Sequence, residues 1–215
     1  AAVSWGVPLS PDRLAQIASY LQELQARTAQ TNLTAESRPA ALLLRHVADG
    51  LAAAGALKAR LRAPAPRVLD LGAGGGFIGM AVKIAWPEAR VTLMESVQRK
   101  YRFLNGMAAR SGLRDLSVSW HRAGQGAPYR DRDFDAVTAR ALAPLPEALS
   151  LALPLTAPDG LFVAFQTDRP DPGEPLLARA LAMQAARLLE CIPYRLPLED
   201  RDRCLAVFQK EGSVS

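Results

Sequence analysis

The feature that most constrains this chain is the glycine-rich stretch 68–79, which reads Val-Leu-Asp-Leu-Gly-Ala-Gly-Gly-Gly-Phe-Ile-Gly. It predicts a short buried strand that ends at Asp70, a tight turn, and a helix that begins at Phe77. The turn carries alternating glycines, namely Gly72, Gly74 and Gly76. Such residues turn the backbone sharply and leave no Cβ in the way of a ligand. Main-chain N–H groups at the helix start can then bind a nucleotide-type cofactor.

The order of residues in this turn narrows the kind of cofactor. Asp70 precedes the glycines in the pattern D-x-G-x-G-x-G. An acid in that place favours a cofactor with a cationic or amino-acid end, such as S-adenosylmethionine, over a dinucleotide pyrophosphate. The spacing of Gly74, Gly76 and Gly79 alone is weak, because it also occurs in purely structural turns. The preceding strand pattern and the following helical pattern favour a cofactor site.

Strand and helix patterns alternate after a proline-containing link at 60–66. Expected strands cover 67–70, 90–95, 117–121, 135–139, 161–166, 194–196 and 204–209. Expected helices cover 77–85, 97–111, 145–153 and 175–190. This alternation predicts an α/β fold with a mostly parallel, seven-stranded sheet and helices on both faces. Two helical patterns, one from Ser10 and one over 39–54, precede the link. We therefore expect a helical N-terminal extension, 1–62, and an α/β domain, 63–215.

Ligands of such a sheet bind at the carboxyl ends of the strands. Glu95 ends the second strand, 19 residues past Gly76, where a carboxylate can accept hydrogen bonds from two ribose hydroxyls; the alternative is a solvated acid. Ala123 and Gly124 follow the third strand and are small enough for an adenine ring to reach the backbone. Arg140 follows the fourth strand and could bind a cofactor carboxylate or a substrate phosphate. The alternative for Arg140 is a salt bridge to Asp70 or Glu95.

Composition and the remaining polar residues are less specific. The net charge is +5, and 22 of the 26 basic residues are arginine. This suits a polyanionic partner, but a GC-rich coding sequence would give the same bias. Cys191 and Cys204 have no metal-type spacing, so we expect reduced core thiols, no metal site and a cytoplasmic protein. No window reaches about 18 apolar residues, so we expect no membrane span. His46 and Asp49 share a helix face, as a local hydrogen bond or as part of a site.

Several motifs in a fixed order resemble the RsmG (GidB) family of bacterial enzymes that methylate N7 of a guanine in 16S ribosomal RNA. The resemblance covers about residues 14–166. The matching residues are Asn32-Leu33-Thr34, Arg45-His46-Val47-Ala48-Asp49, the turn 69–79, Trp86-Pro87-Glu88, Leu93-Met94-Glu95-Ser96, Lys100-Tyr101-Arg102-Phe103-Leu104 and 134–143. The resemblance implies a class I, Rossmann-like methyltransferase fold with a helical N-terminal extension.

The resemblance also implies roles for individual residues. S-adenosylmethionine would be bound by the turn residues Asp70, Gly72, Gly74, Gly76 and Phe77, with Glu95 on the ribose, Ala123 and Gly124 on the adenine, and Arg140 as the catalytic residue that closes the site. RNA would be bound by the basic residues Arg45, Arg99, Lys100 and Arg102. The expected partner is 16S rRNA or the small ribosomal subunit, and the expected state is a monomer.

This sequence departs from the family pattern in three places. Gln166-Thr167 replaces a Lys-Gly pair, Gly124-Gln125 replaces acidic residues, and the chain stops at Ser215 without a basic, proline-rich tail. The residues that would hold RNA are therefore less well matched than the cofactor turn. A methyltransferase of the same fold acting on another RNA or a small molecule, or a non-catalytic ribosome-binding relative, stays open.

Guanine N7 suits a sequence without an obvious general base near the turn. Its in-plane lone pair needs no deprotonation, so the enzyme mainly has to align the reacting atoms. The chain has Ala139-Arg140-Ala141-Leu142 where exocyclic-amine methyltransferases carry an Asn-Pro-Pro-Tyr type of loop. Neither cysteine is placed at a strand end to attack a pyrimidine. A ring nitrogen is therefore the better acceptor, and neither His46 nor His121 needs to lie near the crevice.

Overall fold

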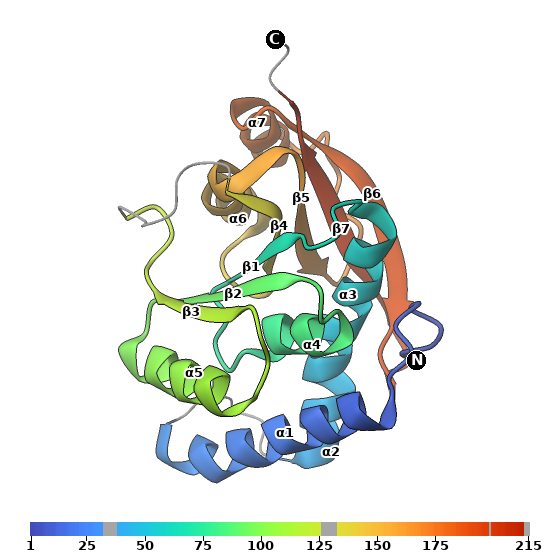
Figure 1. Ribbon diagram of the computed structural model, residues 1–215. Helices are drawn as coiled ribbons and strands as arrows, with labels where there is room; N and C mark the ends of the chain where they lie inside the picture. The colour runs from blue at the N-terminus through green and yellow to red at the C-terminus, as the bar shows by residue number, and fades with distance from the viewer. Residues whose placement is uncertain (32–37, 126–132, 198, 213–215) are drawn as a thin grey trace.

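The computed structural model describes residues 1–31, 38–125, 133–197 and 199–212. A seven-stranded sheet runs through the molecule in the order β3-β2-β1-β4-β5-β7-β6 (Figure 1). The strands are β1 (Arg67–Leu71), β2 (Arg90–Glu95), β3 (Leu116–Trp120), β4 (Phe134–Ala139), β5 (Thr156–Gln166), β6 (Ala186–Arg195) and β7 (Asp202–Lys210). The expectation of a mostly parallel, seven-stranded α/β sheet is confirmed.

Strand direction fixes where a ligand can bind. β3, β2, β1, β4 and β5 are parallel, whereas β7 is antiparallel to both β5 and β6. The strand order reverses between β1 and β4, since chain connections from β1 lead outward to β2 and β3 on one side and later to β4 and β5 on the other. Such a reversal opens a crevice at the carboxyl ends of the two central strands. The glycine turn follows β1 at this point.

Helices cover both faces of the sheet. They are α1 (Pro11–Thr31), α2 (Pro39–Ala41), the π-helical segment η1 (Leu42–Val47), α3 (Ala48–Arg60), α4 (Phe77–Ala85), α5 (Gln98–Arg110), α6 (Leu145–Ala152), the 3₁₀ segment η2 (Leu153–Leu155) and α7 (Pro175–Met183). Figure 1 shows α3, α4 and α5 on one face and α6 and α7 on the other. Successive strand residues divide accordingly: Val68 packs in the first core and Leu69 in the second.

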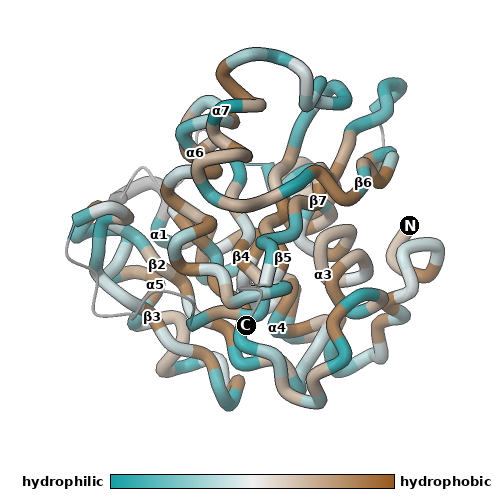
Figure 2. The backbone as a smooth tube through the Cα atoms, turned by 90° about the horizontal axis from the view of Figure 1, so that it is seen from above, coloured by the Kyte–Doolittle hydropathy of each residue, from teal (hydrophilic) through white to brown (hydrophobic). Residues whose placement is uncertain are grey.

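The N-terminal helices share the first core with the α/β body. Leu24 of α1, Leu57 of α3 and Ile84 of α4 are all buried in it. The continuous helical stretch Pro39–Arg60 has 22 residues and is long and apolar enough to span a membrane, which the sequence expectation overlooked. Most of its apolar window is buried inside the fold, as in the core helix of a soluble domain. The apolar parts of the chain gather along the central strands and α3 (Figure 2).

One predicted element is wrong. The helix expected over 175–190 ends at Met183, and Ala186–Arg195 is strand β6 rather than a helix followed by a short strand at 194–196. Ala185 has a positive φ of 46° and turns the chain back. Residues 186–190, Ala-Arg-Leu-Leu-Glu, favour a helix locally, but pairing with β7 along the whole strand overrides that preference. β5 also begins earlier than expected, at Thr156.

The other predicted elements agree with the structure to within a few residues. The helix from Phe77 to Ala85 and the strand from Arg90 to Glu95 are confirmed as predicted. The second helix runs past its expected end at Ala54 and continues to Arg60. The motif Asn32-Leu33-Thr34 lies outside the described residues, as do 126–132 and the last residues of the chain, 213–215.

Candidate active site

The glycine turn has the sharply turned backbone that its sequence predicts. Gly72, Gly74 and Gly76 have φ values of 72°, 59° and 86°, in the left-handed region that favours glycine. Gly76 is the N-cap of α4. The N–H groups of Gly72 and Ala73 both donate to the carbonyl of Met94, at 3.0 and 2.9 Å, and so tie the turn to β2. Main-chain hydrogen bonds therefore join the start of the turn to β2.

Asp70 of β1 is hydrogen-bonded to both α4 and β4. Its Oδ2 accepts a hydrogen bond from the Gly79 N–H of α4 at 2.8 Å, and its Oδ1 accepts one from the Thr138 hydroxyl of β4 at 3.2 Å. The carboxyl group is buried, and this burial raises its pKa to about 6 against the pull of those two hydrogen bonds. Asp70 therefore has a structural role in addition to the cofactor role expected from the sequence.

Glu95 reaches back to the same turn from the end of β2. Its Oε2 accepts a hydrogen bond from the Gly74 N–H at 2.8 Å, and its Oε1 accepts one from the Val97 N–H at 2.7 Å. The residue is 5% exposed, so it is not the solvated acid considered as an alternative. Each carboxylate oxygen keeps a second lone pair, which leaves Glu95 able to accept further hydrogen bonds.

A cavity of about 270 Å³ opens above the turn. It is lined by His46, Asp70, Gly72, Ala73, Gly74, Gly75, Phe77, Ile78, Lys100, Arg140 and Ala141. A Cβ added to Gly74 would come no closer than 3.9 Å to another heavy atom, the Gly72 carbonyl oxygen, so the backbone there is bare. Five residues predicted for cofactor binding meet here, namely Asp70, Gly72, Gly74, Phe77 and Arg140.

Phe77 forms an aromatic and cationic wall of this cavity. The His46 ring stacks on it with 4.6 Å between ring centroids and 29° between planes. The Arg140 guanidinium lies 5.6 Å from the centroid of the Phe77 ring, within the range of a cation–π contact. Tyr20 of α1 meets the ring edge-on at 6.4 Å, and its hydroxyl donates to the Gly75 carbonyl at 2.8 Å. Two N-terminal residues thus complete a site whose motif lies elsewhere in the chain.

Arg140 forms a salt bridge with Asp49, and not with either carboxylate that the sequence analysis considered. Arg140 Nη1 donates to Asp49 Oδ2 at 2.7 Å, so the salt-bridge alternative to Asp70 or Glu95 is corrected to Asp49. Asp49 is fully buried. Its Oδ1 accepts a hydrogen bond from the Tyr194 hydroxyl at 2.7 Å, and Arg203 Nη1 lies 3.7 Å from Oδ2. Burial and the nearby Asp49 charge raise the pKa of Tyr194, so that residue stays a neutral donor.

The remaining predicted cofactor residues lie at the margin of the cavity or outside it. Gly76 is packed beneath the turn, where an added Cβ would lie 2.8 Å from Leu104. Ala123 packs against the second core, on the α6 side of the sheet. A Cβ on Gly124, whose φ is 78°, would lie 3.4 Å from Leu151 of α6. Neither Ala123 nor Gly124 lines this cavity.

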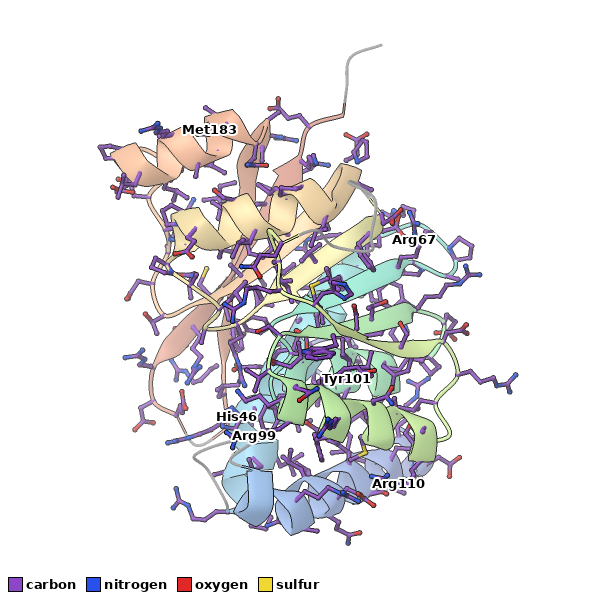
Figure 3. The ribbon with its side chains drawn as sticks, turned by 90° about the vertical axis from the view of Figure 1, so that its left-hand side faces the viewer. His46, Arg67, Arg99, Tyr101, Arg110 and Met183 are labelled. Atoms are coloured by element: carbon purple, nitrogen blue, oxygen red, sulfur yellow. The ribbon has the colours of Figure 1, made fainter. Side chains whose placement is uncertain are left out.

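The predicted RNA-binding residues differ in their surroundings. Lys100 is half-buried and lines the cavity, whereas Arg99 and Arg102 are exposed on α5. Figure 3 shows Arg99 and Tyr101 projecting from the first part of this helix. Arg45 is an ion-pair partner of Glu199, with 3.4 Å between Nε and Oε1. Among the described residues, no group of three or more His, Cys, Asp or Glu side chains could hold a metal ion.

Sequence reasoning missed two contributors to the site, Tyr20 and Tyr194, and left His46 and Asp49 open between a local hydrogen bond and a site. The shared helix face of His46 and Asp49 was the one available signal, and the two side chains serve different partners, Phe77 for His46 and Arg140 for Asp49. Tyr20 and Tyr194 have no local motif. They reach the site only because α1 and β6 pack beside it.

The strand order, the glycine turn and the crevice define a class I, Rossmann-like methyltransferase fold. A solved structure described as a SAM-dependent methyltransferase from Aquifex aeolicus superposes with a TM-score of 0.55, covering 80% of this chain and 93% of that chain at 16% identity. At that identity the similarity concerns the fold alone.

Sequence comparison then gives the family. The family model GidB, described as rRNA small subunit methyltransferase G, matches residues 13–190. Among curated relatives, Ribosomal RNA small subunit methyltransferase G of Roseiflexus castenholzii is 36% identical over 203 residues, which is 91% of this chain and 83% of that protein. The protein of the same name from Myxococcus xanthus is 34% identical over 208 residues, 96% of this chain and 92% of the relative. The chain belongs to this family.

Proposed function

We propose that this chain transfers a methyl group from S-adenosylmethionine to N7 of a guanine in 16S ribosomal RNA, as a cytoplasmic monomer. The observation that carries the proposal is the cavity above the bare glycine turn, bounded by Arg140 and the Phe77 ring. The name of the family supplies the substrate class, the RNA of the small ribosomal subunit.

The residues around the turn fit this cofactor. The bare backbone at Gly74 leaves room for it to approach closely. Glu95 would bind the ribose hydroxyls with the lone pairs that Gly74 and Val97 leave free. Arg140 donates one N–H to Asp49 and keeps other N–H groups that could bind the carboxylate of the cofactor. Ala123 and Gly124 would meet the adenine at the margin of the crevice.

The chemistry asks little of the protein beyond alignment. The cofactor supplies a methyl group already activated by a positively charged sulfur. Guanine N7 offers a lone pair without losing a proton, so no side chain has to act as a base. Correct placement of two reactants is worth roughly 7–11 kcal/mol. A rigid wall of Phe77, with His46 stacked on it and Arg140 fixed by Asp49, suits that task.

RNA would approach over α5. Arg99 and Arg102 are exposed there and Lys100 faces the cavity, so positive charge extends from solvent to the cofactor site. Cations in such a place bind phosphates and make RNA binding dependent on salt. We expect charge reversal at Arg99 and Arg102 to weaken RNA binding and to leave cofactor affinity nearly unchanged.

The proposal is tested by methylation of small ribosomal subunits that lack the modification. Purified protein is incubated with these subunits and S-adenosylmethionine carrying a labelled methyl group, and the RNA is mapped by mass spectrometry. We expect one 7-methylguanine in wild-type reactions and strongly reduced product with Arg140→Ala. Unchanged guanine, with an active family member run alongside, would contradict the proposal. Methylation of free metabolites instead would support the small-molecule alternative.

A further inference from the structure

A stacked pair of aromatic rings, half-exposed Trp120 and partly buried Tyr101, lies at the carboxyl end of β3. Trp120 is the last residue of β3, and Tyr101 lies in the first turn of α5. Their rings stack with 5.9 Å between centroids and 18° between planes. Trp120 is 49% exposed, whereas Trp86 is buried and Trp5 is partly buried. A ring that is stacked on one side and still half exposed can accept a second ring.

The pair is fixed to the site by backbone contacts. Trp120 is the register partner of Glu95 in the β2–β3 pairing, and Glu95 in turn accepts a hydrogen bond from Gly74 of the turn. The indole Nε1 donates to the Ser96 carbonyl at 3.0 Å. This bond satisfies the one polar group of the indole and sets its orientation. The exposed part of Trp120 is therefore apolar ring surface.

Trp120 extends a row of apolar residues beyond the core. Leu116 and Val118 lie on the same face of β3 and pack against the first core at the level of α5. Trp120 comes next in this row, at the carboxyl end of β3 and opposite Glu95 of β2. The position therefore suits a surface that meets a partner.

The charges beside the pair identify the kind of partner. The first turn of α5, 98–101, is fully described and carries Arg99, Lys100 and no acidic residue. Arg102 follows on the exposed side of the helix. Aromatic rings flanked by cations are the usual means of binding single-stranded nucleic acid, because bases stack on the rings and phosphates meet the cations. A double helix would keep its bases stacked and unavailable.

We propose that Trp120 and Tyr101 form a stacking platform for one unpaired base of the substrate RNA, close to the guanine that enters the crevice. Arg99 and Arg102 bind the phosphates of this segment. The inference rests on the proposed function and adds to it a requirement for a single-stranded nucleotide beside the target.

The test compares Trp120→Ala and Trp120→Phe in steady-state methylation, with RNA varied at saturating S-adenosylmethionine and then the reverse. Loss of one stacked base weakens binding by about 5- to 150-fold. We expect the KM for RNA to rise by that factor in Trp120→Ala, to recover partly in Trp120→Phe, and the KM for S-adenosylmethionine to stay within about twofold. Met183→Ala, which removes an exposed apolar side chain of α7, serves as the matched control and should behave as wild type.

The outcomes separate this proposal from the function on which it rests. Wild-type methylation together with an unchanged KM for RNA in Trp120→Ala would overturn the platform and leave the function standing. A rise in the KM for S-adenosylmethionine alone would assign Trp120 to the cofactor and also overturn it. A wild-type protein that methylates no RNA would overturn both. Thermal unfolding of each variant shows whether the fold is retained.

Discussion

The crevice has two halves that are held in different ways. On one side, backbone N–H groups donate to carboxylates that lie close in the sequence: Gly79 donates to Asp70 and Gly74 donates to Glu95. On the other side, Arg140 is fixed by Asp49, which lies 91 residues before it in the chain, and Asp49 is bound by Tyr194, 145 residues after Asp49. The first half depends on backbone donors, and the second on a buried carboxylate between two guanidinium groups. The geometry of the site can therefore be disturbed by a substitution near the turn or by one in a distant, packed part of the chain.

The largest effect is expected from Asp49→Asn. It removes the charge that holds Arg140 and that lies 3.7 Å from Arg203, which keeps its closer ion pair with Glu199. Loss of one partner of a buried ion pair costs about 3–5 kcal/mol of unfolding free energy. Urea denaturation measures it, with the exposed Asp200→Asn as a control that should stay within about 0.5 kcal/mol of wild type. Equal stability of Asp49→Asn and wild type would show that the Arg140–Asp49 ion pair does not stabilise this side of the crevice.

The next effect is a pH dependence of the unfolding free energy, caused by Asp70 beside the glycine turn. Burial raises the pKa of folded Asp70 to about 6, above its ordinary value of 3.8. Between these pH values the folded protein binds a proton that the unfolded chain has lost, so stability falls as pH rises from about 4 to 6. Above that window the ionised carboxyl lowers stability by an amount on the order of 3 kcal/mol.

Asp70→Asn does not titrate, so it should remove this slope. We expect the variant to be more stable than wild type at pH 7.5 and to lose that advantage near pH 4, although its cofactor affinity should fall. Urea denaturation at several pH values measures the difference. If the stability difference between the variant and wild type does not change with pH, burial does not raise the pKa of Asp70 in the folded protein.

Gly79→Ala tests the close packing beneath the turn. A Cβ at this position would lie 2.1 Å from Leu93 Cδ2 and 2.9 Å from the Cβ of Asp70. Overpacking of a buried site costs about 1–3 kcal/mol. The control is Gly173→Ala in an exposed loop, where the nearest atom would be an Asp171 carboxylate oxygen at 3.3 Å. Thermal melting should separate the two variants, and similar melting temperatures would contradict the packing described for Gly79.

The last comparison concerns two tyrosines, one in each half, and its smallest effect is expected from Tyr20. Tyr20 donates to a neutral carbonyl, that of Gly75, whereas Tyr194 donates to the Asp49 carboxylate. A neutral hydrogen bond contributes about 0.5–1.5 kcal/mol and one to a charged group about 1.5–3 kcal/mol. Tyr194→Phe should therefore destabilise the fold more than Tyr20→Phe in matched denaturation curves. A larger loss of unfolding free energy in Tyr20→Phe than in Tyr194→Phe would contradict this account.

The difference between the halves also explains what the sequence could predict. The glycine spacing, Phe77 at the helix start and Glu95 at a strand end follow from local rules, and the crevice position of Arg140 follows from the parallel order of the strands. The partner of Arg140 could not be predicted, because it depends on how α3 packs beside β6. The first part of β6, residues 186–190, is wrongly predicted as a helix, because local preference there is outweighed by pairing with β7.

Calorimetric titration with S-adenosylmethionine tests most directly whether the two halves form one cofactor site. We expect wild-type protein to bind one equivalent. Arg140→Ala should bind at least about 10-fold more weakly, the loss expected for one charged hydrogen bond, and Asp49→Asn should change affinity in the same direction while folded. No heat of binding in the wild type, or wild-type affinity in Arg140→Ala, would contradict a cofactor site built from both halves.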